Sequence, residues 1–113
     1  MPKTKPAKKK KENEGVTEMA SFPGGKVALL KYLKNNLKYP PAAKYYRKQG
    51  RVVCTFTVVE DGSITNIKVA QSIDPALDKE AVRVIKAMPR WNPAKENGVP
   101  VKINYFLPIT FSL

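Results

Sequence analysis

The chain has 113 residues, the size of one domain, and its 21 Lys and Arg against 9 Asp and Glu give a formal net charge of +12. It contains no histidine, and Cys54 is its only cysteine. A zinc site, a nucleophile activated by histidine and an internal disulfide are therefore excluded.

The N-terminal segment differs in composition from the rest of the chain. Residues 1–14 hold six lysines, two glutamates and two prolines, with almost no apolar side chains. Such a segment buries too little surface to offset the entropy lost on ordering. We expect residues 1–21 to be the disordered, Lys/Pro-rich end of a linker and residues 22–113 to form the folded domain. The sequence predicts no transmembrane helix, because no run of about 20 apolar residues occurs.

The next stretch, Lys26 to Leu37, has the spacing of an amphipathic helix. Its apolar residues recur every three or four positions, and we expect them to face the core: Val27, Leu30, Leu33 and Leu37. Tyr39-Pro40-Pro41 then forces an extended backbone. Residues 42–49 have room for one or two further helical turns.

A β-hairpin is predicted in the middle of the chain. Arg51–Glu60 and Ser63–Ser72 are rich in β-branched residues, and Asp61-Gly62 between them supplies the positive φ of a tight turn. Both faces of the first strand are largely apolar. A strand that can be covered on both faces usually lies in the centre of a sheet.

A second helix is predicted after the hairpin. Asp74 can accept amide hydrogens of the first turn, Pro75 suits the first helical position, and Pro89 ends the helix. Its apolar stripe consists of Leu77, Ala81, Val84, Ile85 and Met88. We expect Trp91 to cover the core and residues 91–98 to form a loop.

The last segment, Val101–Leu113, alternates between apolar and mostly polar residues, as a strand does. Pro108 has no amide hydrogen for a ladder, so this strand belongs at an edge. A right-handed return places it beside the first strand. The predicted fold class is α+β: a three-stranded antiparallel sheet of order 2-1-3, two helices packed on one face, and an open edge at the last strand.

Short motifs recur in a characteristic order through residues 22–113. They are Phe22-Pro23-Gly24-Gly25, Tyr39-Pro40, Gln49-Gly50-Arg51-Val52, Asp61-Gly62-Ser63-Ile64, Asp74-Pro75, Leu77-Asp78, Glu80-Ala81, Met88-Pro89, Trp91, Pro93, Leu107-Pro108-Ile109 and Phe111. With these motifs the chain resembles the C-terminal domain of TonB-type energy transducers, particularly the form common in Bacteroidetes-like bacteria.

The resemblance implies a periplasmic domain, tethered to the inner membrane by an N-terminal helix and a Pro/Lys-rich linker. Such a transducer takes work from proton-driven motor proteins of the inner membrane, which its N-terminal part contacts. It delivers this work to TonB-dependent outer-membrane transporters for nutrient uptake. The domain captures the TonB box, a short segment at the transporter's periplasmic N-terminus, by strand addition. The linker spans the periplasm and can contact peptidoglycan.

The expected peptide-binding site combines the open edge with the Tyr-Pro region. An edge strand binds an extended peptide through its unpaired backbone groups. We expect the contact at Val101, Lys102, Ile103, Asn104, Tyr105, Phe106 and Leu107, with Asn36, Lys38, Tyr39 and Pro40 close by. Asn104 and Phe106 are expected on the face away from the helices. The family has Gln-type residues near Tyr-Pro, where this chain has Asn36 and Lys38.

Two other hypotheses concern the identity of the parent protein and the binding of nucleic acid. Similar domains also end membrane sensor peptidases and other envelope proteins. Tyr45 and Tyr46 beside Lys44, Arg47 and Lys48 are compatible with a basic domain that binds single-stranded nucleic acid. The alternative, which we favour, is that the two tyrosines pack under the hairpin, the basic side chains are solvated, and no nucleic acid is a partner.

An enzyme is not expected. The only clustered acids are Asp74, Asp78 and Glu80, and the start of a helix accounts for them. We therefore expect no catalytic residues, no metal and no cofactor. The open edge permits pairing between two copies, but we expect a monomer.

Overall fold

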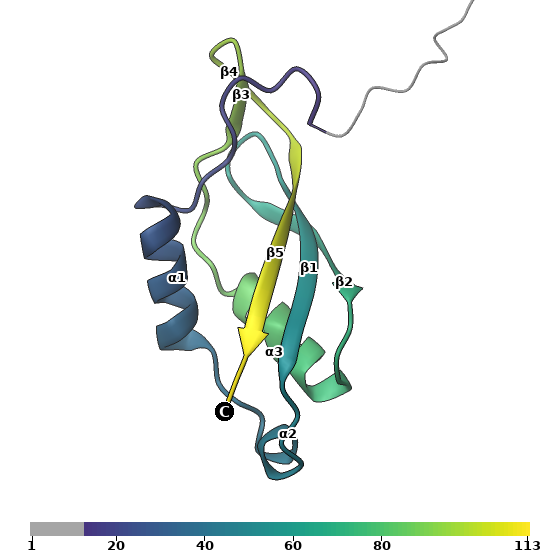
Figure 1. Ribbon diagram of the computed structural model, residues 1–113. Coiled ribbons are helices and arrows are strands. Elements are labelled where there is room, and N and C mark those ends of the chain that lie inside the picture. Colours follow the sequence, from purple (N-terminus) through teal and green to yellow (C-terminus); the bar gives the residue numbers. More distant parts are fainter. Residues whose placement is uncertain (1–12) are drawn as a thin grey trace, which may run out of the picture.

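The computed structural model describes residues 13–113 (Figure 1). Residues 1–12, the larger part of the expected linker, lie outside the described residues. The elements in chain order are α1 (Gly25–Asn36), α2 (Pro41–Tyr45), β1 (Gly50–Val58), β2 (Ile64–Gln71), α3 (Pro75–Lys86), β3 (Ala94–Glu96), β4 (Val99–Val101) and β5 (Ile103–Phe111). In this part of the chain no helix is long and apolar enough to cross a membrane.

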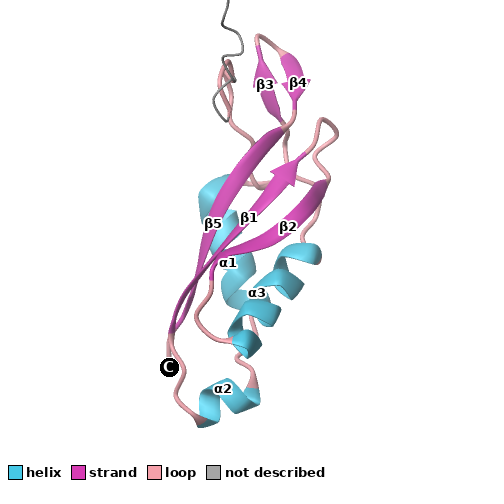
Figure 2. Ribbon diagram, turned by 90° about the vertical axis from the view of Figure 1, so that its right-hand side faces the viewer, coloured by secondary structure: helices cyan, strands magenta, loops and turns pink. Residues whose placement is uncertain are grey.

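The main sheet has the predicted topology. Its order is β2-β1-β5, and both pairings are antiparallel. β1 pairs with β5 along its whole length, from Gly50 opposite Phe111 to Val58 opposite Ile103. The pairing with β2 has register shifts, and Asn66 has a φ of 55° near one of them. Helices α1 and α3 lie on one side of this sheet (Figure 2).

The core lies between the sheet and the helices. The face of β1 that carries Val52, Cys54, Phe56 and Val58 is fully buried, and so is the predicted stripe of α3 from Leu77 to Ile85. The opposite face of β1 is only partly buried at Val53 and Thr55. β1 is thus central as predicted, but the helices cover one of its faces only.

Helix α1 packs only partly as expected: Leu33 is buried and Leu37 is half-buried against the core. Leu29 and Leu33 are buried, whereas Val27 is 77% exposed and Leu30 is 57% exposed. The expectation that Val27 and Leu30 face the core is therefore wrong. Leu29 and Leu30 are neighbours about 100° apart around the helix axis, and the packing of α1 against the sheet selects Leu29.

The hairpin turn and Trp91 fit together closely. Gly62 has a φ of 89°, as the Asp-Gly motif predicts, and a Cβ atom there would lie 2.0 Å from the Trp91 carbonyl oxygen. The Trp91 amide donates to the Gly62 carbonyl oxygen over 2.9 Å. The indole is buried and contacts the rings of Phe22, Phe56 and Tyr105. Trp91 therefore covers the core, as expected.

Residues 94–101 form a second, small hairpin, whereas we expected a loop over residues 91–98 and the last strand from Val101 onward. β3 pairs with β4 around Asn97 and Gly98, which both have positive φ, and β5 begins only at Ile103. Strands of three residues are too short for a periodic pattern. Residues 17–21 lie along the small hairpin and the segment before it. The backbone amides of Thr17 and Glu18 donate to the Lys95 carbonyl, and Ser21 forms an antiparallel β-bridge with Asn92. The division into a linker (1–21) and a domain (22–113) stays a prediction.

Candidate functional site

The outer edge of β5 carries backbone groups that no strand of the described residues pairs. At Asn104 both groups point outward and meet the side chain of Asn13. The Asn13 Nδ2 donates to the Asn104 carbonyl over 3.0 Å, and the Asn104 amide donates to Asn13 Oδ1 over 3.1 Å. Backbone groups of alternate residues point to the same side of a strand. Phe106, Pro108 and Thr110 therefore also turn their backbone groups outward.

Pro108 interrupts this row of groups. Phe106 and Thr110 each present an amide and a carbonyl to the outside, whereas Pro108 presents a carbonyl only. The proline thus lies in an edge strand with its nitrogen on the unpaired side, as the sequence predicts. A strand added here can form hydrogen bonds with the amide and the carbonyl of Phe106 and of Thr110. At Pro108 it can donate to the carbonyl but finds no amide donor.

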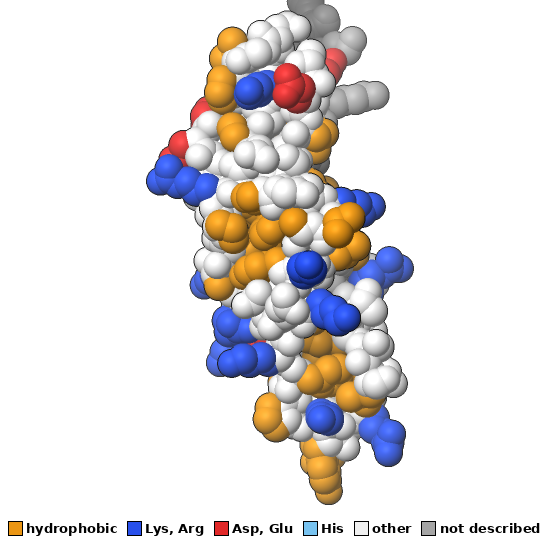
Figure 3. All heavy atoms as spheres, turned by 90° about the vertical axis from the view of Figure 1, so that its left-hand side faces the viewer, with side chains coloured by type: hydrophobic (Ala, Val, Ile, Leu, Met, Phe, Trp, Pro, Cys, Tyr) orange, Lys and Arg blue, Asp and Glu red, His pale blue; other side chains and the backbone are white. Residues whose placement is uncertain are grey.

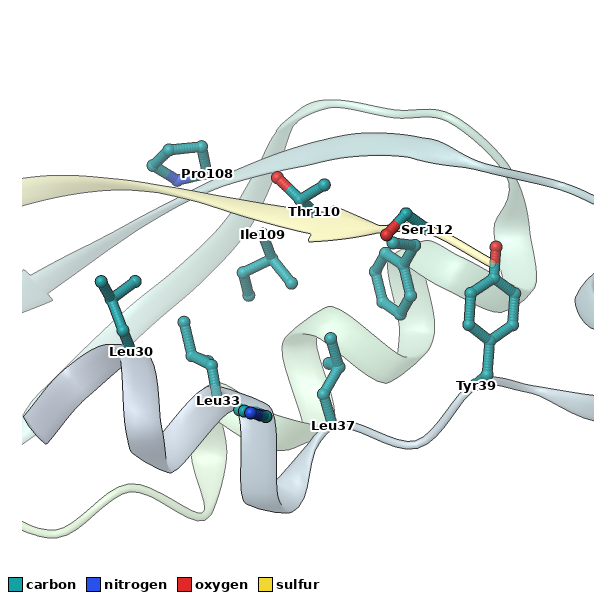
Figure 4. Close-up of a pocket in the computed structure, with 10 residues that line it drawn as sticks. Leu30, Leu33, Leu37, Tyr39, Pro108, Ile109, Thr110 and Ser112 are labelled. Carbon is teal, nitrogen blue, oxygen red and sulfur yellow. The ribbon is translucent and has the colours of Figure 1, made fainter. Parts of the chain in front are cut away.

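A groove lies beside the C-terminal half of this edge (Figure 4). It has a volume of about 360 Å³ and is lined by Leu30, Leu33, Lys34, Leu37, Tyr39 and residues 108–112. Ile109 of β5 points toward Leu30 and Leu33 of α1, while Pro108 and Thr110 point away from the helix. On this side of the molecule hydrophobic side chains gather between Lys and Arg side chains (Figure 3). The groove can accept apolar side chains of an extended chain beside β5.

Tyr39 is fixed at the end of the groove. Its ring packs edge-on against Phe111, with ring centroids 5.7 Å apart. Its hydroxyl donates to the carbonyl of Lys48. These two contacts join the segment after α1 to the end of β5 and to the segment that leads into β1.

Glu80 holds the segment before Tyr39 against α3. Its buried carboxylate accepts from the Lys38 amide over 2.7 Å and from Arg83 Nε and Nη2 over 2.7 and 2.8 Å. Arg83 Nη2 also donates to the Asn36 carbonyl over 2.9 Å. The hydrogen bonds from Arg83, and to a lesser extent that from Lys38, lower the pKa of Glu80 against the opposing effect of burial.

The sequence indicated only that Glu80 belongs to the acidic start of the helix, and this structural role was not predicted. The signal was present in the spacing. Glu80 follows Leu77 by three positions and immediately precedes Ala81, so it lies on the buried stripe, and Arg83 follows it by three.

The structure divides the predicted site residues into two groups. Asn36, Lys38, Tyr39 and Pro40 lie near the C-terminal end of β5, because Tyr39 contacts Phe111. Val101 ends β4, and residues 103–107 form the N-terminal half of β5, which extends over roughly 25 Å. The two groups are therefore not brought together, and the groove residues Leu30, Leu37 and Ile109 were not foreseen.

Phe106 is 59% exposed and Asn104 is exposed, on the face away from the helices as expected. The side-chain oxygen of Asn104 accepts from the Thr57 hydroxyl over 2.9 Å. Lys38 and Pro40 line a second groove of about 350 Å³ against α3.

The tip around α2 is more exposed than we expected. Tyr45 and Tyr46 are 79% and 68% exposed, so the expectation that they pack under the hairpin is wrong. Their rings contact each other edge-on at 4.9 Å. Helix α2 has only five residues and buries Ala43 alone, so its other side chains extend into solvent, including Lys44.

Comparison with known proteins places this geometry in a family. Residues 35–113 match the family described as the Gram-negative bacterial TonB protein C-terminal. Protein TonB of Haemophilus influenzae is 36% identical over 70 residues, which cover 61% of this chain and 26% of that protein. Protein TonB of Helicobacter pylori is 36% identical over 77 residues, which cover 67% of this chain and 26% of that protein. The matched region thus spans about a quarter of the length of these relatives.

Two solution structures of the Helicobacter pylori TonB C-terminal domain have a similar fold. One has a TM-score of 0.60 at 25% identity and covers 77% of this chain and 78% of that chain. A shorter form has a TM-score of 0.58 at 25% identity, with coverages of 76% and 90%.

Proposed function

Because the chain belongs to the Gram-negative bacterial TonB C-terminal family, we propose that it is the periplasmic peptide-binding domain of a TonB-type energy transducer. The full-length protein is anchored in the inner membrane and takes work from proton-driven motor proteins through its N-terminal part. This domain passes the work to outer-membrane transporters by capturing their N-terminal box peptide. The domain itself has no catalytic role.

The observation that supports this function is the row of outward backbone groups beside an apolar groove. A peptide strand added along residues 106–110 bonds to the amides and carbonyls of Phe106 and Thr110 and to the carbonyl of Pro108. Its side chains alternate between the groove and the solvent-exposed face of the sheet. The groove favours apolar side chains, and Lys34 in its lining favours an acidic residue nearby.

The proposal predicts a defined footprint in an amide NMR titration. We would add peptides from the periplasmic N-termini of the host's outer-membrane transporters at about 150 mM salt, where nonspecific charge contacts are screened. Shifts should concentrate on residues 106–110 and around Tyr39. The proposal is wrong if no such peptide causes shifts there.

Two exposed residues of α1 provide a matched pair of variants. Leu30 lines the groove, whereas Val27 is exposed on the same helix and does not line it. Leu30→Gln should weaken peptide binding about fivefold, because an apolar contact of roughly 1 kcal/mol is lost. Val27→Gln should leave the affinity unchanged. Equal effects of the two substitutions would exclude the groove from the binding site.

A second candidate, single-stranded nucleic-acid binding, is favoured by the exposed tip. Tyr45 and Tyr46 lie beside the exposed Lys44, Arg47 and Lys48, a combination that can stack on bases and attract phosphates. Saturable binding of a short oligonucleotide at about 150 mM salt, mapped to residues 44–51, would favour this function. We propose that the peptide function prevails and that binding of oligonucleotide disappears at this salt concentration.

The alternative parent protein is a membrane sensor peptidase or another envelope protein with the same C-terminal domain. The proposal of a transducer then fails while peptide binding holds. Sequencing the coding region upstream of residue 1 decides between these parents.

A further inference from the structure

The side chain of Asn13 occupies one position of the β5 edge in the way a neighbouring strand would. It donates to the carbonyl and accepts from the amide of the same residue, Asn104. This is the reciprocal pair of hydrogen bonds that two antiparallel strands form at a bonded position. The Thr57 hydroxyl holds the Asn104 side chain from the sheet face. Asn104 is thus held both from within the sheet and from outside it.

A turn and an anchored segment bring Asn13 to this position. Asn13 has a φ of 62° and Gly15 a φ of 89°, and the Val16 amide donates to the Asn13 carbonyl over 3.4 Å. Immediately afterwards, Thr17 and Glu18 are bonded to Lys95. Asparagine tolerates a positive φ and also carries both a donor and an acceptor. Position 13 makes use of both properties.

The outward positions of β5 therefore differ in their availability. The groups of Asn104 are taken by Asn13, whereas no described strand covers those of Phe106, Pro108 and Thr110. A peptide strand that pairs with residues 106–110 leaves Asn13 in place. A strand that continues to Asn104 has to break both bonds of Asn13 before it forms its own.

We propose that Asn13 determines where a bound partner strand ends, by competing with it for the backbone of Asn104. The proposal rests on the peptide-binding function described above. Asn13 favours a short partner segment aligned with the groove and disfavours longer segments that extend toward β4. A long partner strand in turn displaces Asn13 and frees the segment around it from β5, because competition at one position is reciprocal.

Substituting Asn13 by glycine tests the competition with the backbone conformation preserved. Glycine adopts the positive φ of position 13 but lacks the amide side chain. Asn97→Gly is the matched control, because Asn97 has a φ of 52° and lies in the turn of the small hairpin. In the chain without peptide, Asn13→Gly should accelerate hydrogen exchange of the Asn104 amide, and Asn97→Gly should not. Unchanged exchange at Asn104 would overturn the proposal.

The same variants are then titrated with synthetic peptides from transporter N-termini in two lengths, about five and about eight residues. Asn13→Gly should raise the affinity of the longer peptide about tenfold, because two hydrogen bonds no longer have to be exchanged. It should leave the shorter peptide within about twofold, since that peptide does not reach Asn104. Binding of both lengths with no difference between Asn13→Gly and Asn97→Gly overturns the role of Asn13 only. Failure of every peptide to bind any variant overturns the proposed function as well.

Discussion

Glu80→Gln perturbs the anchor of the segment that leads to Tyr39, the residue at the end of the groove beside β5. The carboxylate accepts three hydrogen bonds, from the Lys38 amide and from two nitrogens of Arg83. Glutamine has the same shape, but its side chain offers only one acceptor oxygen. Its NH2 group, which is a donor, would face the donors of Lys38 or Arg83. The carboxylate is buried, while the Arg83 side chain is 48% exposed, so solvent screens part of the ion pair. We therefore expect a loss of about 2 kcal/mol in unfolding free energy.

The effect should depend on pH in a definite direction. The pKa of Glu80 is lower in the folded chain than its ordinary value, chiefly because of the hydrogen bonds from Arg83. Its contribution to stability is therefore complete above the unfolded pKa of about 4.3 and is lost as the pH falls through the lower, folded value. The difference between the wild type and Glu80→Gln should be constant near neutral pH and shrink below about pH 4.

Urea unfolding followed by the fluorescence of Trp91, the only tryptophan, measures both effects. Glu60, an exposed glutamate just after β1, serves as the control through Glu60→Gln. NMR shifts of Tyr39 should change in Glu80→Gln and not in the control, because Lys38 loses its anchor. A change in stability below about 0.5 kcal/mol at pH 7, with Tyr39 unaffected, would refute the role of Glu80.

Three further substitutions or treatments have expected outcomes. Gly62→Ala should lower the free energy of unfolding, measured in urea, by about 3 kcal/mol or more. The new Cβ collides with the Trp91 carbonyl, and the positive φ disfavours alanine. A loss under about 1 kcal/mol would contradict this packing. Burial, with a smaller contribution from Asp78, raises the pKa of Cys54 to about 11, so a thiol reagent at about pH 8 should label Cys54 only when the chain is unfolded. Rapid labelling of the native chain would show that β1 opens. Pro108→Thr supplies the missing outward amide and should tighten peptide binding about fivefold. An unchanged affinity would mean that the added strand does not reach this position.

The main sheet could be predicted because each of its signals is local. Asp61-Gly62 lies between two β-branched runs, Asp74 caps α3 with a bond to the Ala76 amide, and Pro108 marks an edge strand. Each pattern needs only residues that are close in the sequence. Together these local signals predict a single order of strands, and the structure has this order.

Features that depend on packing between distant segments were not predictable. The helical wheel alone could not decide whether Leu29 or Leu30 of α1 is buried, because that depends on how the helix lies against the sheet. The approach of Tyr39 to Phe111 likewise depends on the path from α1 to β1. The predicted contact residues 101–107 therefore lie far from Tyr39, and strand addition at β5 stays a prediction.

Hydrogen exchange at the β5 edge tests the central claim, strand addition, most directly. With a saturating transporter-derived peptide, the outward amides of Phe106 and Thr110 should exchange at least about tenfold more slowly than in the free chain. Leu107 and Ile109, whose amides face β1, should change much less. Binding that leaves Phe106 and Thr110 unprotected would contradict strand addition and assign the peptide to another surface.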